Sequence, residues 1–189
     1  MKKNLLFVVG SLREKSFNSQ LARRAGEIVA DRADISFLDY ADIPFMNQDM
    51  ESPEPAAVAR VRKAVLAADG IWIFTPEYNG SFPGVLKNLL DWLSRPLVPG
   101  DMASGTAVAG KLVTVSGAGG KNATRTVRSD MARLLSFMRM DVICGEGTGV
   151  ALAAENFADD ILTLSAKDED ALSKQAEEFL SAVMSMPRS

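Results

Sequence analysis

Short apolar runs alternate with amphipathic segments along the whole chain. The runs lie at residues 5–9, 35–38, 71–74, 112–115 and 140–144. Apolar residues recur at helical spacing near 21–29, 58–68, 85–93, 131–138 and 172–183. The first run is continuously apolar, as expected for a strand that is buried on both faces. This alternation predicts an α/β protein whose parallel sheet carries helices on both faces.

Composition narrows the class of protein. The 189 residues suffice for one domain with a sizeable core, and no repeat or composition shift divides residues 1–189. The net charge of −3 argues against a nucleic-acid partner, which requires a basic surface. Since no apolar run approaches the roughly 20 residues of a membrane span, we expect no membrane partner. The single Cys144 precludes an internal disulfide and predicts a reducing, cytoplasmic location.

Histidine is absent from the sequence. This removes imidazole acid–base catalysis, His-dependent triads and His-based metal sites, and we expect no metal site of any kind. An enzyme built from this chain would use carboxylates or a cofactor. Because a cofactor that transfers hydride needs few protein acids or bases, we assign no catalytic side chain.

The segment after the first strand has the composition of an anion site. Gly10 permits a tight turn, and the hydroxyls of Ser11 and Ser16 precede a helix whose first N–H groups are free. Arg13 adds a planar donor that can grip two phosphate oxygens. The alternative is that Ser16 or Asn18 only caps the helix while Arg13 is solvated.

Two further polar segments follow the third and fourth strands. Residues 76–88 lie between the run at 71–74 and a helical pattern, and residues 116–122 contain three glycines. Such glycines allow backbone amides to approach a ligand, although a flexible turn would use the same residues. In a doubly wound sheet all three segments converge on one edge, where they could hold a phosphate and a flat ring.

These motifs resemble the NAD(P)H-dependent FMN reductase family, which comprises flavodoxin-like quinone, chromate and azo-dye reductases. The resemblance rests on Gly10-Ser11-x-Arg13-x-x-Ser16-x-Asn18 and on Pro76-Glu77-Tyr78-Asn79-Gly80-Ser81-x-Pro83-Gly84, and it extends over most of the chain. It implies a flavodoxin-like, doubly wound sheet of five parallel strands in the order 2-1-3-4-5. It also implies bound FMN, with NADPH or NADH as co-substrate.

The resemblance also implies roles for individual positions. The FMN phosphate would be held by Ser11, Arg13, Ser16, Phe17 and Asn18. One side of the isoalloxazine would be lined by Pro76, Glu77, Tyr78, Asn79, Gly80 and Ser81. The other side would be lined by Ser116, Gly117, Gly119 and Gly120, whose amides could serve the flavin O2 and N1 edge.

The implied activity has two steps. A nicotinamide delivers hydride to FMN, and a quinone-like, azo, metal-oxyanion or flavin acceptor then receives two electrons. The alternative is a flavodoxin-type electron carrier that docks on partner proteins, although Arg13, Lys15 and the small net charge disfavour it. A regulatory or binding module of the same fold without flavin is a third reading.

The helix predicted after residue 84 is apolar over an unusually wide arc of roughly 160°, at 100° per residue. The residues concerned are Val85, Leu86, Leu89, Leu90, Trp92 and Leu93. Packing on one sheet needs an arc of roughly 100°, so a second apolar contact is expected. A homodimer would supply it, and the resemblance implies dimers that can pair into homotetramers. Alternatively, residues 97–109 cover the helix.

Overall fold

The apolar runs form one central parallel sheet in the computed structural model, which describes residues 2–187. Its strands, in spatial order, are β2 (Ala33–Phe37), β1 (Lys3–Val9), β3 (Gly70–Phe74), β6 (Leu112–Gly119) and β7 (Asp141–Val142). A further strand, β8 (Thr148–Ala151), pairs with the last residues of β6, whereas β7 pairs with the first. The predicted order 2-1-3-4-5 is confirmed, with the fifth position divided between β7 and β8.

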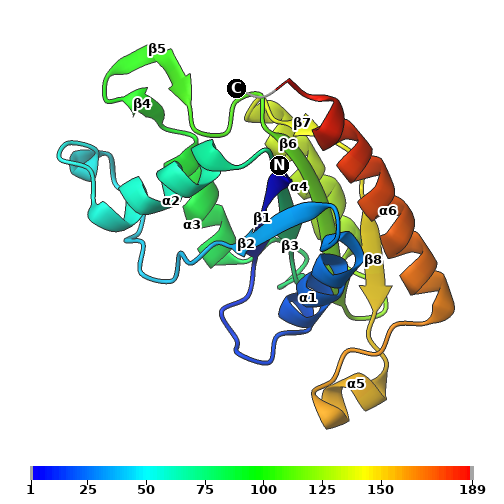
Figure 1. Cartoon of the computed structure of the whole chain (residues 1–189). Helices are drawn as coiled ribbons and strands as arrows, with labels where there is room; N and C mark the ends of the chain where they lie inside the picture. Colours follow the sequence, from blue (N-terminus) through cyan, green and yellow to red (C-terminus); the bar gives the residue numbers. More distant parts are fainter. Residues whose placement is uncertain (1, 188–189) are drawn as a thin grey trace.

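Helices cover both faces of this sheet (Figure 1). On one face lie α1 (Phe17–Val29) and α6 (Ala166–Ser185), and on the other lie α2 (Ala56–Ala67), α3 (Gly84–Leu93) and α4 (Arg125–Phe137). Strand β1 shows the period of two, since Leu6 and Val8 join one core and Leu5 and Phe7 join the other. In the part of the chain described, no helix combines the length and apolar character required to cross a membrane.

The fifth strand was predicted at residues 140–144 but is shorter there. Cys144, Gly145 and Gly147 adopt positive φ, which bends the backbone away from β6 between β7 and β8. The chain then returns as β8, which the sequence reading missed because Gly149 lies within it and weakens a strand pattern.

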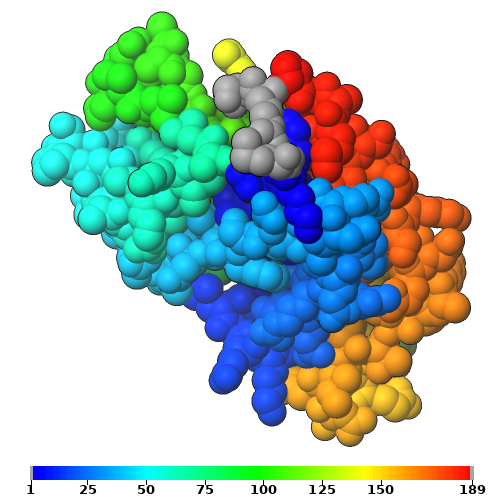
Figure 2. Space-filling view, in the orientation of Figure 1, coloured from blue at the N-terminus to red at the C-terminus, as the bar shows by residue number. Residues whose placement is uncertain are grey.

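Three smaller elements were also missed. The alternative cover for α3 predicted from sequence is a loop at residues 97–109. They instead belong largely to an antiparallel hairpin of β4 (Pro96–Val98) and β5 (Asp101–Thr106), which projects in green from the molecule in Figure 2. The others are the 3-10 helix η1 (Gln48–Met50) and helix α5 (Ala154–Asp159).

The wide apolar arc of α3 is covered within the same chain. Leu86, Leu89, Leu90, Trp92 and Leu93 are all buried, and only Val85 remains partly exposed. The covering segment precedes η1, because the indole Nε1 of Trp92 donates to the Pro44 carbonyl at 2.8 Å. The arc therefore needs neither the hairpin nor a second subunit, and the width of this face no longer argues for a dimer.

Candidate functional site

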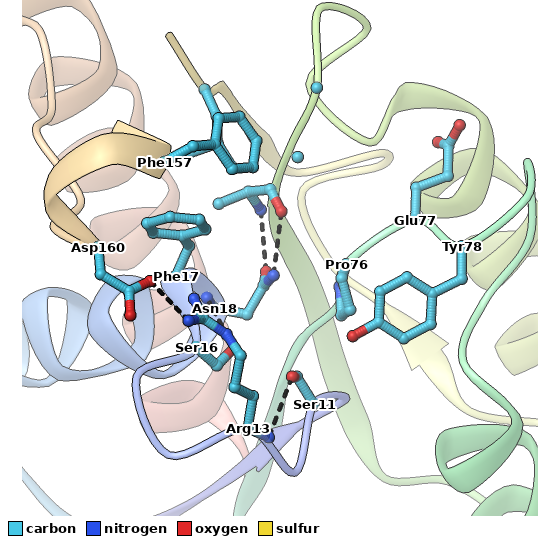
Figure 3. A pocket seen from close by; sticks show the side chains of 14 residues that line it. Ser11, Arg13, Ser16, Phe17, Asn18, Pro76, Glu77, Tyr78, Phe157 and Asp160 are labelled. Carbon is cyan, nitrogen blue, oxygen red and sulfur yellow. Dashed lines mark hydrogen bonds and ion pairs between the residues drawn. The ribbon is translucent and has the colours of Figure 1, made fainter. Parts of the chain in front are cut away.

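A cavity of about 440 Å³ lies where β1, β3 and β6 end. This is the edge at which open α/β sheets bind ligands. Figure 3 shows its lining side chains. Those named from sequence are Ser11, Arg13, Ser16, Phe17, Asn18, Pro76, Glu77, Tyr78, Gly119 and Gly120. The lining also includes Ala118, Leu152, Phe157 and Asp160, which sequence reasoning missed.

The segment that follows β1 leads into the first turn of α1, where backbone N–H donors are free. The Ser16 hydroxyl caps α1 by accepting from the Asn18 N–H at 3.2 Å. Within residues 2–187, the N–H groups of Phe17 and Ser19 form no hydrogen bond. Ser11 Oγ accepts weakly from the Arg13 N–H at 3.4 Å. Unbonded amides at a helix N-terminus, with a hydroxyl and a guanidinium beside them, are suited to an anion.

The Asn18 side chain has a structural task. It is buried, and its amide exchanges two hydrogen bonds with the backbone of Ala118, donating at 3.0 Å and accepting at 2.9 Å (Figure 3). Both polar ends of the side chain are therefore used. Asn18 joins the start of α1 to the end of β6 and fixes the distance between the two walls of the cavity.

Arg13 is held at one end of the cavity by two neighbours. Its guanidinium carbon lies 5.1 Å from the centre of the Phe17 ring, within cation–π range. Its Nη1 donates to Asp160 Oδ1 at 2.5 Å. Phe157 packs edge-on against Phe17, with ring centres 5.4 Å apart, so α5 and the residue that follows it cover this end. No local pattern predicted this approach, because α5 and α1 lie far apart in sequence.

Residues 78–81 form a tight two-residue turn. Tyr78 and Ser81 exchange two backbone hydrogen bonds, at 2.9 and 3.0 Å. Asn79 and Gly80 both adopt left-handed backbone conformations, with φ of 52° and 73°. Asn-Gly is the preferred pair for such a turn, which is the structural reason for these two residues. The turn directs Tyr78 toward the cavity, while Asn79, Gly80 and Ser81 lie outside its lining.

The Glu77 carboxylate connects the second and third polar segments. Oε1 accepts from Asn122 Nδ2 at 2.6 Å and Oε2 accepts from the Val127 N–H at 3.2 Å. Val127 is in the first turn of α4, whose own N-cap residue, Thr124, makes no side-chain cap bond. Glu77 therefore caps a helix from a distant loop. In Figure 3 its side chain points away from that of Tyr78.

The glycine-rich segment is strand as far as Gly119, not a loop from residue 116 onward. Ser116 is fully buried, accepts from the Trp72 indole at 3.0 Å and donates to Gln175 Oε1 at 2.9 Å. It therefore faces the interior, and neither Ser116 nor Gly117 lines the cavity.

Two of the glycines are required by packing. A Cβ on Gly117 would lie 2.2 Å from Thr124 Oγ1, and one on Gly119 would lie 2.6 Å from Thr124 Cγ2. Gly120 differs, because its missing Cβ faces open space, and the approach of a ligand to these glycines stays a prediction.

Arg128 organises the turn between Gly120 and α4. It is buried and donates to the carbonyls of Glu146 at 2.5 Å, Gly147 at 2.7 Å and Ala123 at 3.3 Å. Burial lowers the pKa of this guanidinium from its ordinary value. The residue ties the end of the β6 segment to the bend that divides β7 from β8. Among residues 2–187, no group of three or more acidic, cysteine or histidine side chains is placed to hold a metal ion.

Comparison with known proteins agrees with this geometry. Residues 3–149 match the family described as NADPH-dependent FMN reductase, which is well over half of the chain. The chain belongs to this family. It is 44% identical over 96 residues to a 2-hydroxy-1,4-benzoquinone reductase from a Burkholderia species, a match covering 51% of this chain and 52% of the relative. It is 36% identical over 129 residues to a quinone reductase from Pseudomonas putida, covering 67% and 68%.

The matched region thus spans only about half the length of the Burkholderia relative. Solved structures resemble this chain over nearly its whole length. The flavoenzyme NAD(P)H:(acceptor) oxidoreductase FerB from Paracoccus denitrificans superposes with a TM-score of 0.83 at 25% identity, covering 96% of this chain and 97% of that one. A flavodoxin from the domain Archaea superposes with a TM-score of 0.62 at 13% identity, covering 96% and 99%, which shows a shared fold alone.

Proposed function

We propose that this protein is an NAD(P)H-dependent FMN-containing oxidoreductase that passes two electrons to a small quinone-like acceptor. The proposal rests on one cavity. The start of α1 at one end of this cavity is suited to an anion, and the exposed backbone at the other end leaves space for a ligand. The family match and the names of the quinone reductase relatives support the same reading.

The phosphate end of the cavity fits a flavin mononucleotide. Ser11 and Arg13 line it with a hydroxyl and a guanidinium, and the unbonded N–H groups of Phe17 and Ser19 lie in the first turn of α1. Each is a donor, and a phosphate group offers acceptors alone when fully ionised. These residues would bind the phosphate and set the position of the rest of the cofactor.

The other end of the cavity fits a planar ring. Pro76 and Tyr78 form one side, and the backbone at Gly119 and Gly120 forms the other, with open space above Gly120. When bound, FMN would accept a hydride from a nicotinamide and release two electrons to an acceptor. Backbone N–H groups beside the ring would stabilise the negative charge that reduction adds.

No side-chain acid or base is assigned to the reaction. Glu77 is in the cavity lining between Pro76 and Tyr78, and its two carboxylate oxygens accept from Asn122 Nδ2 and the Val127 N–H. The proposed contribution of the protein is therefore binding, orientation and electrostatics. Such a site is tolerant of its acceptor, and azo, metal-oxyanion and flavin acceptors belong in the panel with quinones.

The decisive experiment uses purified protein reconstituted with FMN. Addition of NADPH or NADH and a benzoquinone should oxidise the nicotinamide without any second protein, and the two nicotinamides tested separately give the preference. Absence of flavin absorbance after incubation with FMN and removal of the free flavin by gel filtration would contradict the proposal. Turnover that requires an added reductase would make the protein an electron carrier instead.

We propose a homodimer, assembled through an apolar surface beside α3. Phe45 is 87% exposed, and it surrounds a small cavity of about 220 Å³ together with Leu12, Val85 and Ile43. Large apolar side chains gathered on one surface commonly mark a protein interface, and a two-fold dimer is the commonest assembly. Light scattering after gel filtration should give twice the monomer mass, or four times if dimers pair. A monomer at micromolar concentration would contradict this.

The proposed location is the cytoplasm. The support is the single cysteine, Cys144, whose thiol has no partner for an internal disulfide. Fractionation of cells that express the protein should recover it with cytoplasmic markers, and recovery with membranes or the exterior would contradict this.

A further inference from the structure

An acidic side chain is placed at the anion-binding end of the cavity. Asp160 lines the cavity, and its Oδ1 lies 2.5 Å from Nη1 of Arg13, the one side-chain cation in that lining. Both partners remain partly exposed, with 33% and 48% of their side-chain surfaces accessible. The donor that a phosphate would use is thus already bound to a carboxylate.

The main chain at Asp160 is held there by contacts that do not involve Arg13. The Gln20 amide on α1 donates to the Asp160 carbonyl at 3.1 Å and accepts from the Leu162 N–H at 2.8 Å. Inside the segment, the buried Asn156 accepts from the Ala153 N–H at 2.8 Å and donates to the Ile161 carbonyl at 2.9 Å. The segment from residue 153 to residue 162, orange in Figure 2, is therefore anchored on α1 whether or not the ion pair forms.

Arg13 is likewise positioned without Asp160. Its guanidinium rests over the Phe17 ring, and Phe17 is itself packed against Phe157. Removal of the Asp160 charge would leave the guanidinium on this aromatic support. Asp160 is thus not needed to place the donor, and its main effect on an arriving anion is electrostatic.

We propose that Asp160 sets the charge preference of the site by competing with the ligand phosphate for Arg13. This inference rests on the proposed function, in which the ligand is FMN. A phosphate that binds Arg13 also lies close to a carboxylate whose main chain is anchored on α1, and like charges in a partly buried site repel strongly. The carboxylate therefore weakens the binding of phosphorylated flavin while leaving unphosphorylated flavin unaffected.

The test compares flavin affinities of Asp160→Asn and the wild-type protein. Asparagine keeps the size of the side chain and tolerates the left-handed backbone at this position, where φ is 59°. FMN should bind about tenfold more tightly to D160N, the factor that corresponds to one charge-assisted hydrogen bond. Riboflavin affinity should be unchanged, and the gain for FMN should shrink as salt screens the charges.

Asp159→Asn is the matched control. Asp159 is the preceding residue, is exposed and makes no ion pair within residues 2–187. The D159N substitution removes one negative charge from the same segment as D160N does. The D159N protein should nevertheless bind both flavins as the wild type does. An equal gain in D159N would reduce the effect to net charge and would overturn the proposal.

Two other outcomes would also overturn it. Weaker FMN binding in D160N would show that Asp160 positions Arg13, and an equal change for FMN and riboflavin would show an effect on shape. Titration with inorganic phosphate, followed by phosphorus NMR, separates this inference from the proposed function. If the wild type binds no flavin, the function fails, while tighter phosphate binding by D160N still supports competition for Arg13 and unchanged binding refutes it.

Discussion

Thr124 explains the small residues at the end of β6. Its side chain is fully buried against Gly117 and Gly119, and its backbone adopts the left-handed conformation with φ of 56°. This conformation turns the chain from β6 into α4 directly beside the cavity. The glycines are needed because a β-carbon at either position would occupy the space of this threonine.

Gly117→Ala should therefore destabilise the fold. The new Cβ would lie 2.2 Å from Thr124 Oγ1 and 2.5 Å from the Thr75 carbonyl, and a backbone atom cannot yield easily. The expected loss in unfolding free energy is about 1–3 kcal/mol, as for overpacked cores. Gly120→Ala, with open space around its Cβ, should stay within about 0.5 kcal/mol. Urea unfolding of both variants measures the difference, and equal stabilities would contradict the packing argument.

Cys144 should be unreactive in the folded protein. Burial raises the pKa of its thiol to about 11, and the Sγ–H also donates to the Gln175 carbonyl at 3.6 Å. Since the folded pKa lies above the unfolded value, the stability from this group is present at neutral pH and is lost as pH rises from about 9 toward about 11. Alkylation by iodoacetamide at pH 8 should be far slower in native than in urea-unfolded protein. Equal rates would contradict it.

At the scale of elements, the cavity depends on connections between loops that follow different strands. Glu77 follows β3 and caps α4, which follows β6. Asn122 lies in the loop between β6 and α4, and its side-chain oxygen accepts from the Thr124 N–H at 3.2 Å. The two loops flanking the proposed ring are thus one hydrogen-bonded unit.

Glu77→Ala should loosen this unit. Loss of the cap on α4 should cost about 1 kcal/mol of unfolding free energy, the usual value for an N-cap. Exchange should accelerate at the backbone N–H of Val127 and at the side-chain amide of Asn122, which both lose their acceptor. Glu178→Ala, an exposed glutamate on α6, serves as the control and should change neither quantity. Faster exchange spread evenly over α4 and α6 would contradict a local cap.

For the whole molecule, Gln175 joins α6 to the centre of the sheet. Its amide nitrogen donates to Thr114 Oγ1 at 2.8 Å and to the Val115 carbonyl at 2.9 Å. Its amide oxygen accepts from Ser116 Oγ at 2.9 Å and from the Thr148 N–H at 2.8 Å. All four hydrogen-bonding positions are used, and the group bridges β6 and β8 where the fifth strand is divided.

Gln175→Leu should be strongly destabilising. It keeps the approximate volume but leaves several buried polar groups without partners, at about 1–3 kcal/mol for each. We expect a total loss of about 2–4 kcal/mol in unfolding free energy, read from urea denaturation. Ser173→Ala, two positions earlier and exposed on the same helix, should be neutral. A loss below that of the control would show that the network adds nothing to stability.

The hydrophobic pattern was sufficient for the main elements, whereas the spatial order of the strands came from the family resemblance. Continuous runs became β1 and β3, and residues at helical spacing became α1, α4 and α6, because burial of an element depends mainly on its own side chains. The polar segments at 10–18 and 76–88 were identified for a related reason. Residues directly after parallel strands share one edge, whatever the details of the fold.

The partners of these segments were decided only by tertiary structure. The sequence shows that α3 is apolar over a wide arc. It does not show that residues near Pro44 cover this arc. The sequence predicts that Arg13 donates hydrogen bonds to a phosphate. It does not show that Asp160, 147 residues later, forms an ion pair with this guanidinium. It shows glycines at 117 and 119, but not that Thr124 occupies their space. A local pattern determines which surfaces must be buried or charged, whereas long-range packing determines what meets them.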